Sequence, residues 1–154
     1  MARKVISALG GNVRGKTAAL LGLTFKPNTD DMRDSPAISI VNALLDKGMT
    51  IRAYDPEGME EARKVLPGEV QYGASPYEIA EGADCLVIIT EWDAFRALDF
   101  DRLKQIMAQP VLVDLRNIYV PSEMADLGFR YESVGRPTGA GHLPPLNPDA
   151  FGSD

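Results

Sequence analysis

The chain has 154 residues, of which 45% are hydrophobic and 25% charged, the size and balance of one globular domain. Its formal net charge of −6 argues against nucleic acid or an anionic membrane as a partner. No run approaches about 18 consecutive apolar residues, so no membrane-spanning helix is predicted. The single cysteine, Cys85, fits a reducing compartment, for which we expect the cytoplasm.

Residues 1–11 are expected to form the end of a helix. Val5, Ile6 and Leu9 fall on one helical face, and Gly10-Gly11 supplies a left-handed stop. A chain that starts inside an amphipathic helix has two interpretations: a short N-terminal arm, or a piece of a longer protein.

From residue 17 onward, apolar runs typical of buried strands alternate with helical segments, two of which begin at a Ser-Pro pair. The expected strands are 17–23, 50–54, 70–72, 84–90, 111–115 and 130–134. The expected helices lie within 35–48, 57–66, 75–82, 101–107 and 122–127. This alternation predicts an α/β fold with a doubly wound, six-stranded parallel sheet of order 3-2-1-4-5-6, covered by helices on both faces.

Three parts of the chain are expected from this pattern. Residues 1–11 precede the folded domain, which spans 12–136, and residues 137–154 lack periodicity and are expected to be a flexible tail. His142 lies in that tail, where we expect it to be solvated rather than catalytic.

The polar stretch from Gly22 to Pro36, between the first strand and the first helix, is too long for a simple connection, which usually needs about 2–6 residues. In the predicted strand order it faces the loop 91–95 across the crevice where doubly wound sheets bind ligands. The loop 114–117 lies one strand further along. We interpret the long loop as half of a nucleotide site.

Three cations in these loops are candidate contacts for an anionic ligand: Lys26, Arg33 and Arg116. For Lys26 and Arg33, the spacing supports ligand binding and pairing with the nearby aspartates equally. Arg116 is likewise open between a structural role and a ligand role. Asp30-Asp31 suits a turn that orients an arginine better than it suits a metal site.

The remaining residues favour structure over chemistry. Asp55, placed where a ribose-binding acid would lie, is better explained as a turn and helix cap, and G-x-G-x-x-G is absent after the first strand. Trp92 suits a cover over the strand ends better than a base-stacking role, and Cys85 suits a buried apolar position. No catalytic residue and no metal site are predicted, so the residues alone indicate a binding module.

With these residues in hand, the chain resembles the C-terminal domain of the UDP-glucose/GDP-mannose dehydrogenase family. The resemblance covers about residues 5–137. It is carried by Gly15-Lys16, the segment from Gly22 to Arg33, Ser35-Pro36, Ala53-Tyr54-Asp55-Pro56, Thr90-Glu91-Trp92 and Asp114-Leu115-Arg116-Asn117.

The resemblance implies NAD-dependent oxidation of UDP-glucose at C6, with a role for each candidate residue. Phe25, Lys26 and Arg116 would bind the UDP-sugar, and Arg33 would reach NAD across a domain cleft. Residues 1–11 would be the end of a central helix that links two domains and forms a homodimer. The N-terminal NAD domain and the catalytic cysteine would lie outside this chain, which is therefore not expected to catalyse the reaction alone.

Two alternatives remain. The chain could be a stand-alone nucleotide-binding or assembly module. It could also be the same domain from a UDP-N-acetylmannosamine or GDP-mannose dehydrogenase.

Overall fold

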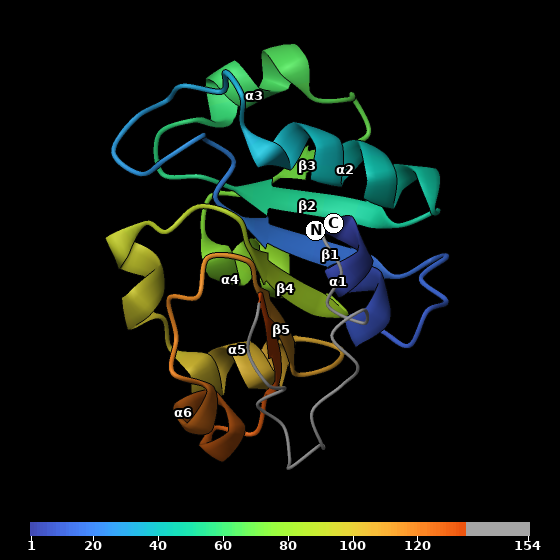
Figure 1. Ribbon diagram of the computed structural model, residues 1–154, viewed down its shortest axis with the longest axis vertical. Coiled ribbons are helices and arrows are strands. Elements are labelled where there is room, and N and C mark those ends of the chain that lie inside the picture. The colour runs from blue at the N-terminus through green and yellow to red at the C-terminus, as the bar shows by residue number, and fades with distance from the viewer. Residues whose placement is uncertain (135–154) are drawn as a thin grey trace.

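The computed structural model describes residues 1–134. In this part of the chain, six strands form one parallel sheet in the order β3-β2-β1-β4-β5-β6 (Figure 1). The predicted fold class and strand order are confirmed. The strands are β1 Thr17–Leu21, β2 Thr50–Tyr54, β3 Gln71–Tyr72, β4 Cys85–Ile88, β5 Val111–Asp114 and β6 Arg130–Ser133.

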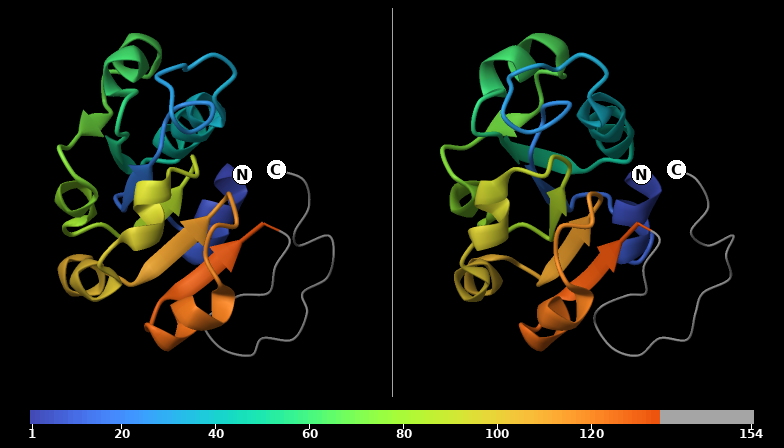
Figure 2. Two further views of the ribbon diagram at one scale, coloured as in Figure 1. Left: turned by 90° about the vertical axis from the view of Figure 1, so that its left-hand side faces the viewer. Right: turned by 60° about the vertical axis from the view of Figure 1, so that its left-hand side comes forward.

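Helices connect the strands and cover both faces of the sheet (Figure 2). They are α1 Ala2–Ala8, α2 Pro36–Asp46, α3 Met59–Val65, α4 Pro76–Ala80, α5 Phe100–Ile106, α6 Pro121–Asp126 and the 3-10 helix η1 Asp93–Ala97. The sequence pattern indicates no helix at η1, which forms because Phe95 turns inward and is fully buried. No helix in the described residues is long and apolar enough to cross a bilayer.

The starts of α2 and α4 are fixed by the predicted serine caps. Ser35 Oγ accepts a hydrogen bond from Ala37 N at 3.1 Å, and Ser75 Oγ accepts one from Glu78 N at 3.1 Å. A proline follows each of the two serines at the first helical position. Both Ser-Pro signals therefore mark true helix starts.

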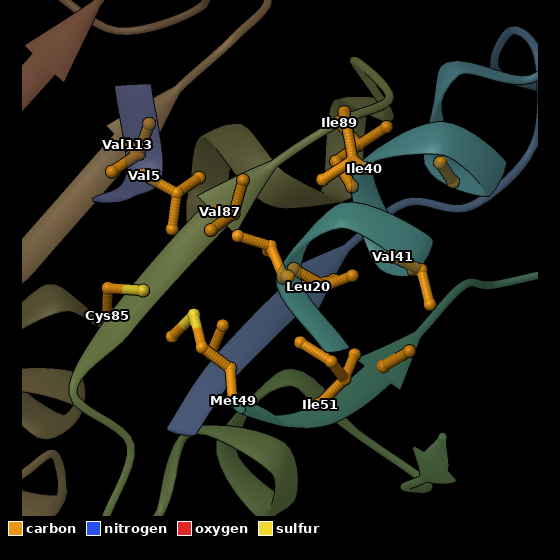
Figure 3. Packing of buried hydrophobic residues seen from close by; sticks show 14 of the residues in the cluster. Val5, Leu20, Ile40, Val41, Met49, Ile51, Cys85, Val87, Ile89 and Val113 are labelled. Carbon is orange, nitrogen blue, oxygen red and sulfur yellow. The ribbon is translucent and has the colours of Figure 1, made fainter. Parts of the chain in front are cut away.

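The core consists of two apolar layers, one on each face of the sheet. Ala18 and Leu20 of β1 pack into the first layer, with α1 and α2, and Ala19 and Leu21 pack into the second, with α4, α5 and α6. Figure 3 shows the first layer, to which Cys85 belongs. Burial raises the pKa of the Cys85 thiol to about 12, so it serves as a core residue, as predicted.

Helix α1 belongs to this packed body. It contacts α2, β5 and β6, and its Val5 is fully buried. Gly10 and Gly11 then reverse the chain with φ values of 88° and 94°, which confirms the predicted left-handed stop. The expected tail, 137–154, and His142 lie outside the described residues.

Candidate functional site

Three loops meet at the carboxyl edge of the sheet. They follow β1, β4 and β5 and lie at the left of Figure 1, in blue, yellow and orange. Because the strand order reverses between β1 and β4, this edge of the sheet is where a doubly wound fold binds its ligand. The candidate site is therefore built from the loop after β1, residues 22–35, and from the ends of β4 and β5.

The loop at 22–35 is closed by its own hydrogen bonds. At its base, Ser35 Oγ donates to the carbonyl of Leu23, and further out Phe25 N donates to the carbonyl of Asp31 at 2.9 Å. Asn28 and Asp34 adopt left-handed φ values of 65° and 59°, which these residue types tolerate. Despite its length, the loop is a folded element.

Asp55, at the end of β2, fastens this loop to the sheet. Its Oδ2 accepts hydrogen bonds from Leu23 N at 2.7 Å and Thr24 N at 3.1 Å. Its Oδ1 accepts from Glu57 N at 2.9 Å and Gly58 N at 2.8 Å. Since both oxygens of this fully buried carboxylate are used by backbone N–H groups, Asp55 is a turn residue, as predicted. The predicted helix cap is wrong: the N-cap of α3 is Gly58, and no side chain of the described residues caps this helix, because the bonds of Asp55 end in the turn before it.

A second fastening joins the loops after β1 and β4. Thr90 Oγ1 donates to the carbonyl of Thr24 at 2.7 Å. Beside it, Gly22 has a φ of 89°, and a Cβ there would lie 2.5 Å from Thr90 Cβ and 2.6 Å from Thr90 N. Only glycine allows the two loops to approach this closely.

The fastened loop presents Phe25 and Lys26 to solvent. Phe25 is 49% exposed although it is a large aromatic residue, and the Lys26 side chain is exposed as well. Lys26 forms no ion pair within residues 1–134, while its backbone carbonyl lies 2.9 Å from Thr24 Oγ1. The loop thus holds, on a fixed backbone, an aromatic ring and an ammonium group that has no ion pair in the described part of the chain.

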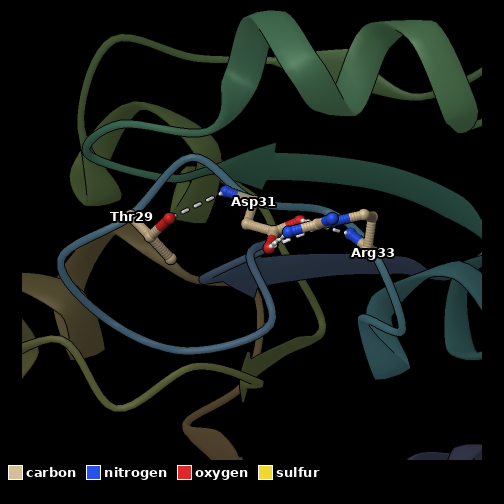
Figure 4. Close-up of polar contacts among 3 residues, drawn as sticks. All are labelled: Thr29, Asp31 and Arg33. Carbon is tan, nitrogen blue, oxygen red and sulfur yellow. Dashed lines mark hydrogen bonds and ion pairs between the residues drawn. The ribbon is translucent and has the colours of Figure 1, made fainter.

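Arg33 is paired within the same loop (Figure 4). Its Nε lies 3.0 Å from Oδ1 of Asp31 and its Nη2 lies 2.9 Å from Oδ2, while Asp31 N donates to Thr29 Oγ1 at 3.2 Å. The predicted role of Asp31 in orienting an arginine is confirmed. The Arg33 side chain is still 88% exposed and lines a hollow of about 580 Å³ between the loop and α3.

The Asp31–Arg33 pair predicts a distinct titration. The Arg33 side chain, then its backbone N–H, holds the pKa of Asp31 at about 2, below the usual 3.8. A carboxyl with a lowered pKa stabilises the fold above its ordinary pKa, and this contribution is lost as pH falls through about 2. We expect a carboxyl-carbon NMR titration to place the Asp31 midpoint near 2 and Arg33→Ala to return it toward 3.8. A midpoint near 3.8 in the unsubstituted chain would contradict the pairing.

Arg116 lies at the start of the loop after β5, where both its backbone and its side chain are hydrogen-bonded. Its backbone N donates to Asp114 Oδ1 at 3.0 Å. Its Nε donates to Glu91 Oε2 at 2.7 Å, and its Nη2 forms an ion pair with the same oxygen. Arg116 therefore has a structural partner, yet its side chain stays 39% exposed at the carboxyl edge of the sheet.

Asp114 organises the turn that carries Arg116. Its Oδ2 accepts hydrogen bonds from Ile118 N at 2.8 Å, Tyr119 N at 3.1 Å and Tyr131 Oη at 2.7 Å. The carboxylate is fully buried, so these donors replace its water shell. This arrangement repeats that of Asp55: a buried aspartate at a strand end shapes the loop that follows.

The structure places Phe25, Lys26 and Arg116 on loops that meet at one edge of the sheet, whereas Arg33 lies on the side that faces α3. Trp92 is only 7% exposed and packs in the second apolar layer, which agrees with the predicted cover. The sequence pattern indicates no partner for Glu91. The contact between Glu91 and Arg116 can be inferred only from the pairing of β4 with β5, which brings the two loops together.

Within residues 1–134, no group of three or more histidine, cysteine, aspartate or glutamate side chains is arranged to hold a metal ion.

Comparison with known proteins agrees with this geometry. Residues 19–121 match the model of the UDP-glucose/GDP-mannose dehydrogenase family, UDP binding domain, and the chain belongs to this family. It is 64% identical over 137 residues to UDP-glucose 6-dehydrogenase of Rhizobium meliloti (strain 1021), covering 89% of this chain and 31% of that protein. It is 45% identical over 137 residues to UDP-glucose 6-dehydrogenase of Pseudomonas aeruginosa, covering 86% and 30%.

Solved structures share the fold. NDP-N-acetyl-D-galactosaminuronic acid dehydrogenase from Methanosarcina mazei Go1 superposes with a TM-score of 0.77 at 28% identity, covering 92% of this chain and 30% of that one. A UDP-glucose dehydrogenase from Pyrobaculum islandicum superposes with a TM-score of 0.63 at 34% identity, covering 73% and 25%. The chain spans about 31% of the length of its curated relative from R. meliloti.

Proposed function

We propose that this chain is the UDP-sugar-binding part of an NAD-dependent UDP-glucose 6-dehydrogenase, which converts UDP-glucose to UDP-glucuronate. The observation that carries this proposal is the exposed Phe25-Lys26 pair, held on a fastened loop at the same sheet edge as Arg116. It is found in a chain whose curated relatives are UDP-glucose 6-dehydrogenases. The comparisons favour neither a stand-alone module nor a dehydrogenase for another nucleotide-sugar.

The three side chains divide the ligand between them. The Lys26 ammonium group and the outer N–H groups of Arg116 neutralise the diphosphate, for which a point charge and a planar fork are complementary donors. Phe25 offers its ring face to an apolar face of the ligand. The fixed backbone lowers the entropy lost when these groups are ordered by binding.

Within residues 1–134, the end of β2 does not offer the carboxylate that a dinucleotide site of the standard kind uses for a ribose. Both oxygens of Asp55 are occupied by backbone donors, so no carboxylate at the end of β2 is left for a ribose. In this proposal NAD, which would accept the hydride removed from the sugar, is held mainly by an N-terminal domain outside this chain. Arg33, oriented by Asp31 and 88% exposed, is the group that would reach it.

The proposal also covers the organisation of the chain. Residues 1–11 are the end of an inter-domain helix and 12–136 are the UDP-sugar-binding domain, while the expected tail, 137–154, lies outside the described residues. The whole enzyme is a homodimer located in the cytoplasm, and this chain is inactive by itself.

Calorimetric titration of the chain with UDP tests the proposed site. We expect Lys26→Ala and Arg116→Ala each to lower UDP affinity about tenfold or more, because each removes a charge-assisted contact of about 1.5–3 kcal/mol. Lys47→Ala, which removes an exposed lysine beyond the end of α2, is the matched control and should leave the affinity unchanged. Unchanged affinity in both site variants would overturn the site, and NAD reduction by this chain with UDP-glucose would overturn its assignment as a non-catalytic part.

A further inference from the structure

We propose that Glu91 is a positioning residue of the anion site, which holds the Arg116 guanidinium so that its outer N–H groups face the diphosphate. The proposal rests on the proposed function. It assigns Glu91 no contact with the ligand itself.

The contact with Glu91 leaves the outer edge of the Arg116 guanidinium, formed by Nη1 and Nη2, available for a ligand. Oε2 of Glu91 binds Nε at 2.7 Å and also binds Nη2, so the carboxylate takes one edge of the Arg116 group. A guanidinium has five N–H donors, and no hydrogen bond from Nη1 to any residue of the described chain is found. The remaining Nη1 and Nη2 donors can therefore bind two phosphate oxygens side by side.

Glu91 is itself held by its neighbours in the chain. Thr90 is bonded to the loop after β1, and Trp92 N donates to the Thr90 carbonyl at 3.0 Å. The Trp92 ring is buried, and the Trp92 carbonyl accepts from Phe95 N at 3.0 Å. The carboxylate thus extends from a backbone anchored on both sides.

This frame connects the two halves of the anion site. The carbonyl of Lys26 lies 2.9 Å from Thr24 Oγ1, and the Thr24 carbonyl accepts from Thr90 Oγ1 at 2.7 Å. Glu91, the next residue, then holds Arg116. Through these contacts the position of the arginine is set relative to the loop that carries the lysine.

Positioning explains why a carboxylate lies beside a site for an anion. A negative charge near a diphosphate opposes binding, and an ion pair that is 39% and 26% exposed adds little to stability. An arginine that is already ordered, however, loses less side-chain freedom when the ligand binds. The structure therefore favours orientation of Arg116 as the role of Glu91.

A double-mutant cycle with UDP tests this role. We expect Glu91→Ala to lower UDP affinity about fivefold, because a loosened arginine must be ordered by the ligand, and Glu91→Gln to lose less. In the Arg116→Ala background neither substitution should lower the affinity further, and removal of the carboxylate charge beside the anion should raise it slightly. Glu69→Gln, which removes an exposed charge before β3, is the control and should leave the affinity unchanged. For variants that bind UDP too weakly for calorimetry, a UDP titration followed by NMR measures the affinity.

An NMR signal reports on positioning without any ligand. The Arg116 Nε–H resonance should exchange slowly with water in the unsubstituted chain and rapidly in Glu91→Gln. Higher UDP affinity in Glu91→Ala, an equal loss in the Arg116→Ala background, or an Nε–H signal unaffected by Glu91→Gln would each overturn the proposal. The Arg116→Ala variant is measured first, because it tests the proposed site by itself. If it leaves UDP affinity unchanged, the proposed function of the site is wrong, whatever the Glu91 variants show.

Discussion

Replacing Asp55 with asparagine is expected to lower the free energy of unfolding by about 3–4 kcal/mol, because buried backbone donors lose their acceptor. The carboxylate accepts four backbone N–H groups, at distances between 2.7 and 3.1 Å, and is fully buried. An amide keeps one acceptor oxygen and turns an NH2 group toward backbone donors, which leaves buried polar groups unpaired. Urea or guanidinium unfolding, monitored by circular dichroism, measures the loss.

The control for this substitution is Asp46→Asn in the last turn of α2, away from the buried network of Asp55. It changes the same functional group and should alter the free energy of unfolding by less than about 0.5 kcal/mol. An equal effect at the two positions would show that the hydrogen bonds of Asp55 do not stabilise the fold. Because Asp55 holds Leu23 and Thr24, we also expect its asparagine variant to bind UDP more weakly.

Gly22→Ala should have an effect of similar size, about 2–4 kcal/mol, from backbone strain and overlap together. The backbone at Gly22 has a φ of 89°, which costs an L-residue about 1–2 kcal/mol, and the added methyl group would overlap Thr90 at 2.5 Å. The two loops would have to separate to admit it. Thermal and chemical unfolding of the variant measure the cost.

Gly82→Ala is the control that separates backbone strain from steric overlap of the added methyl group. Gly82 has a φ of 72°, but no atom lies within 4 Å of the point that an alanine Cβ would occupy there, so only the backbone cost of about 1–2 kcal/mol is expected. A loss at Gly22 no larger than that at Gly82 would mean that the approach to Thr90 is not tight in solution.

Much of the fold could be predicted from local signals. Strand β2 has the predicted bounds, Thr50–Tyr54, because the strand pattern there is closed by Asp55-Pro56. The Ser-Pro pairs place the starts of α2 and α4 since serine caps and proline begin a helix. The strand order could also be predicted, because right-handed crossovers between parallel strands allow few sheet topologies.

Contacts between distant residues could not be predicted in this way. Strand β1 ends at Leu21 rather than at Leu23 because Leu23 N donates to Asp55, 32 positions away, instead of to a neighbouring strand. Spacing left the partner of Arg33 open among several nearby aspartates, and the structure selects Asp31. The Glu91–Arg116 contact joins residues 25 positions apart whose types alone do not pair them.

In the loop after β1, the residues that determine the backbone shape are different from the residues whose side chains are exposed to solvent. Asp55, Thr90 and Ser35 face inward and fix the backbone, while Phe25 and Lys26 face outward and take no part in that network through their side chains. The outward side chains can therefore be exchanged at little cost to folding. This makes the domain a scaffold on which the proposed ligand preference can be altered by substituting only these outward positions.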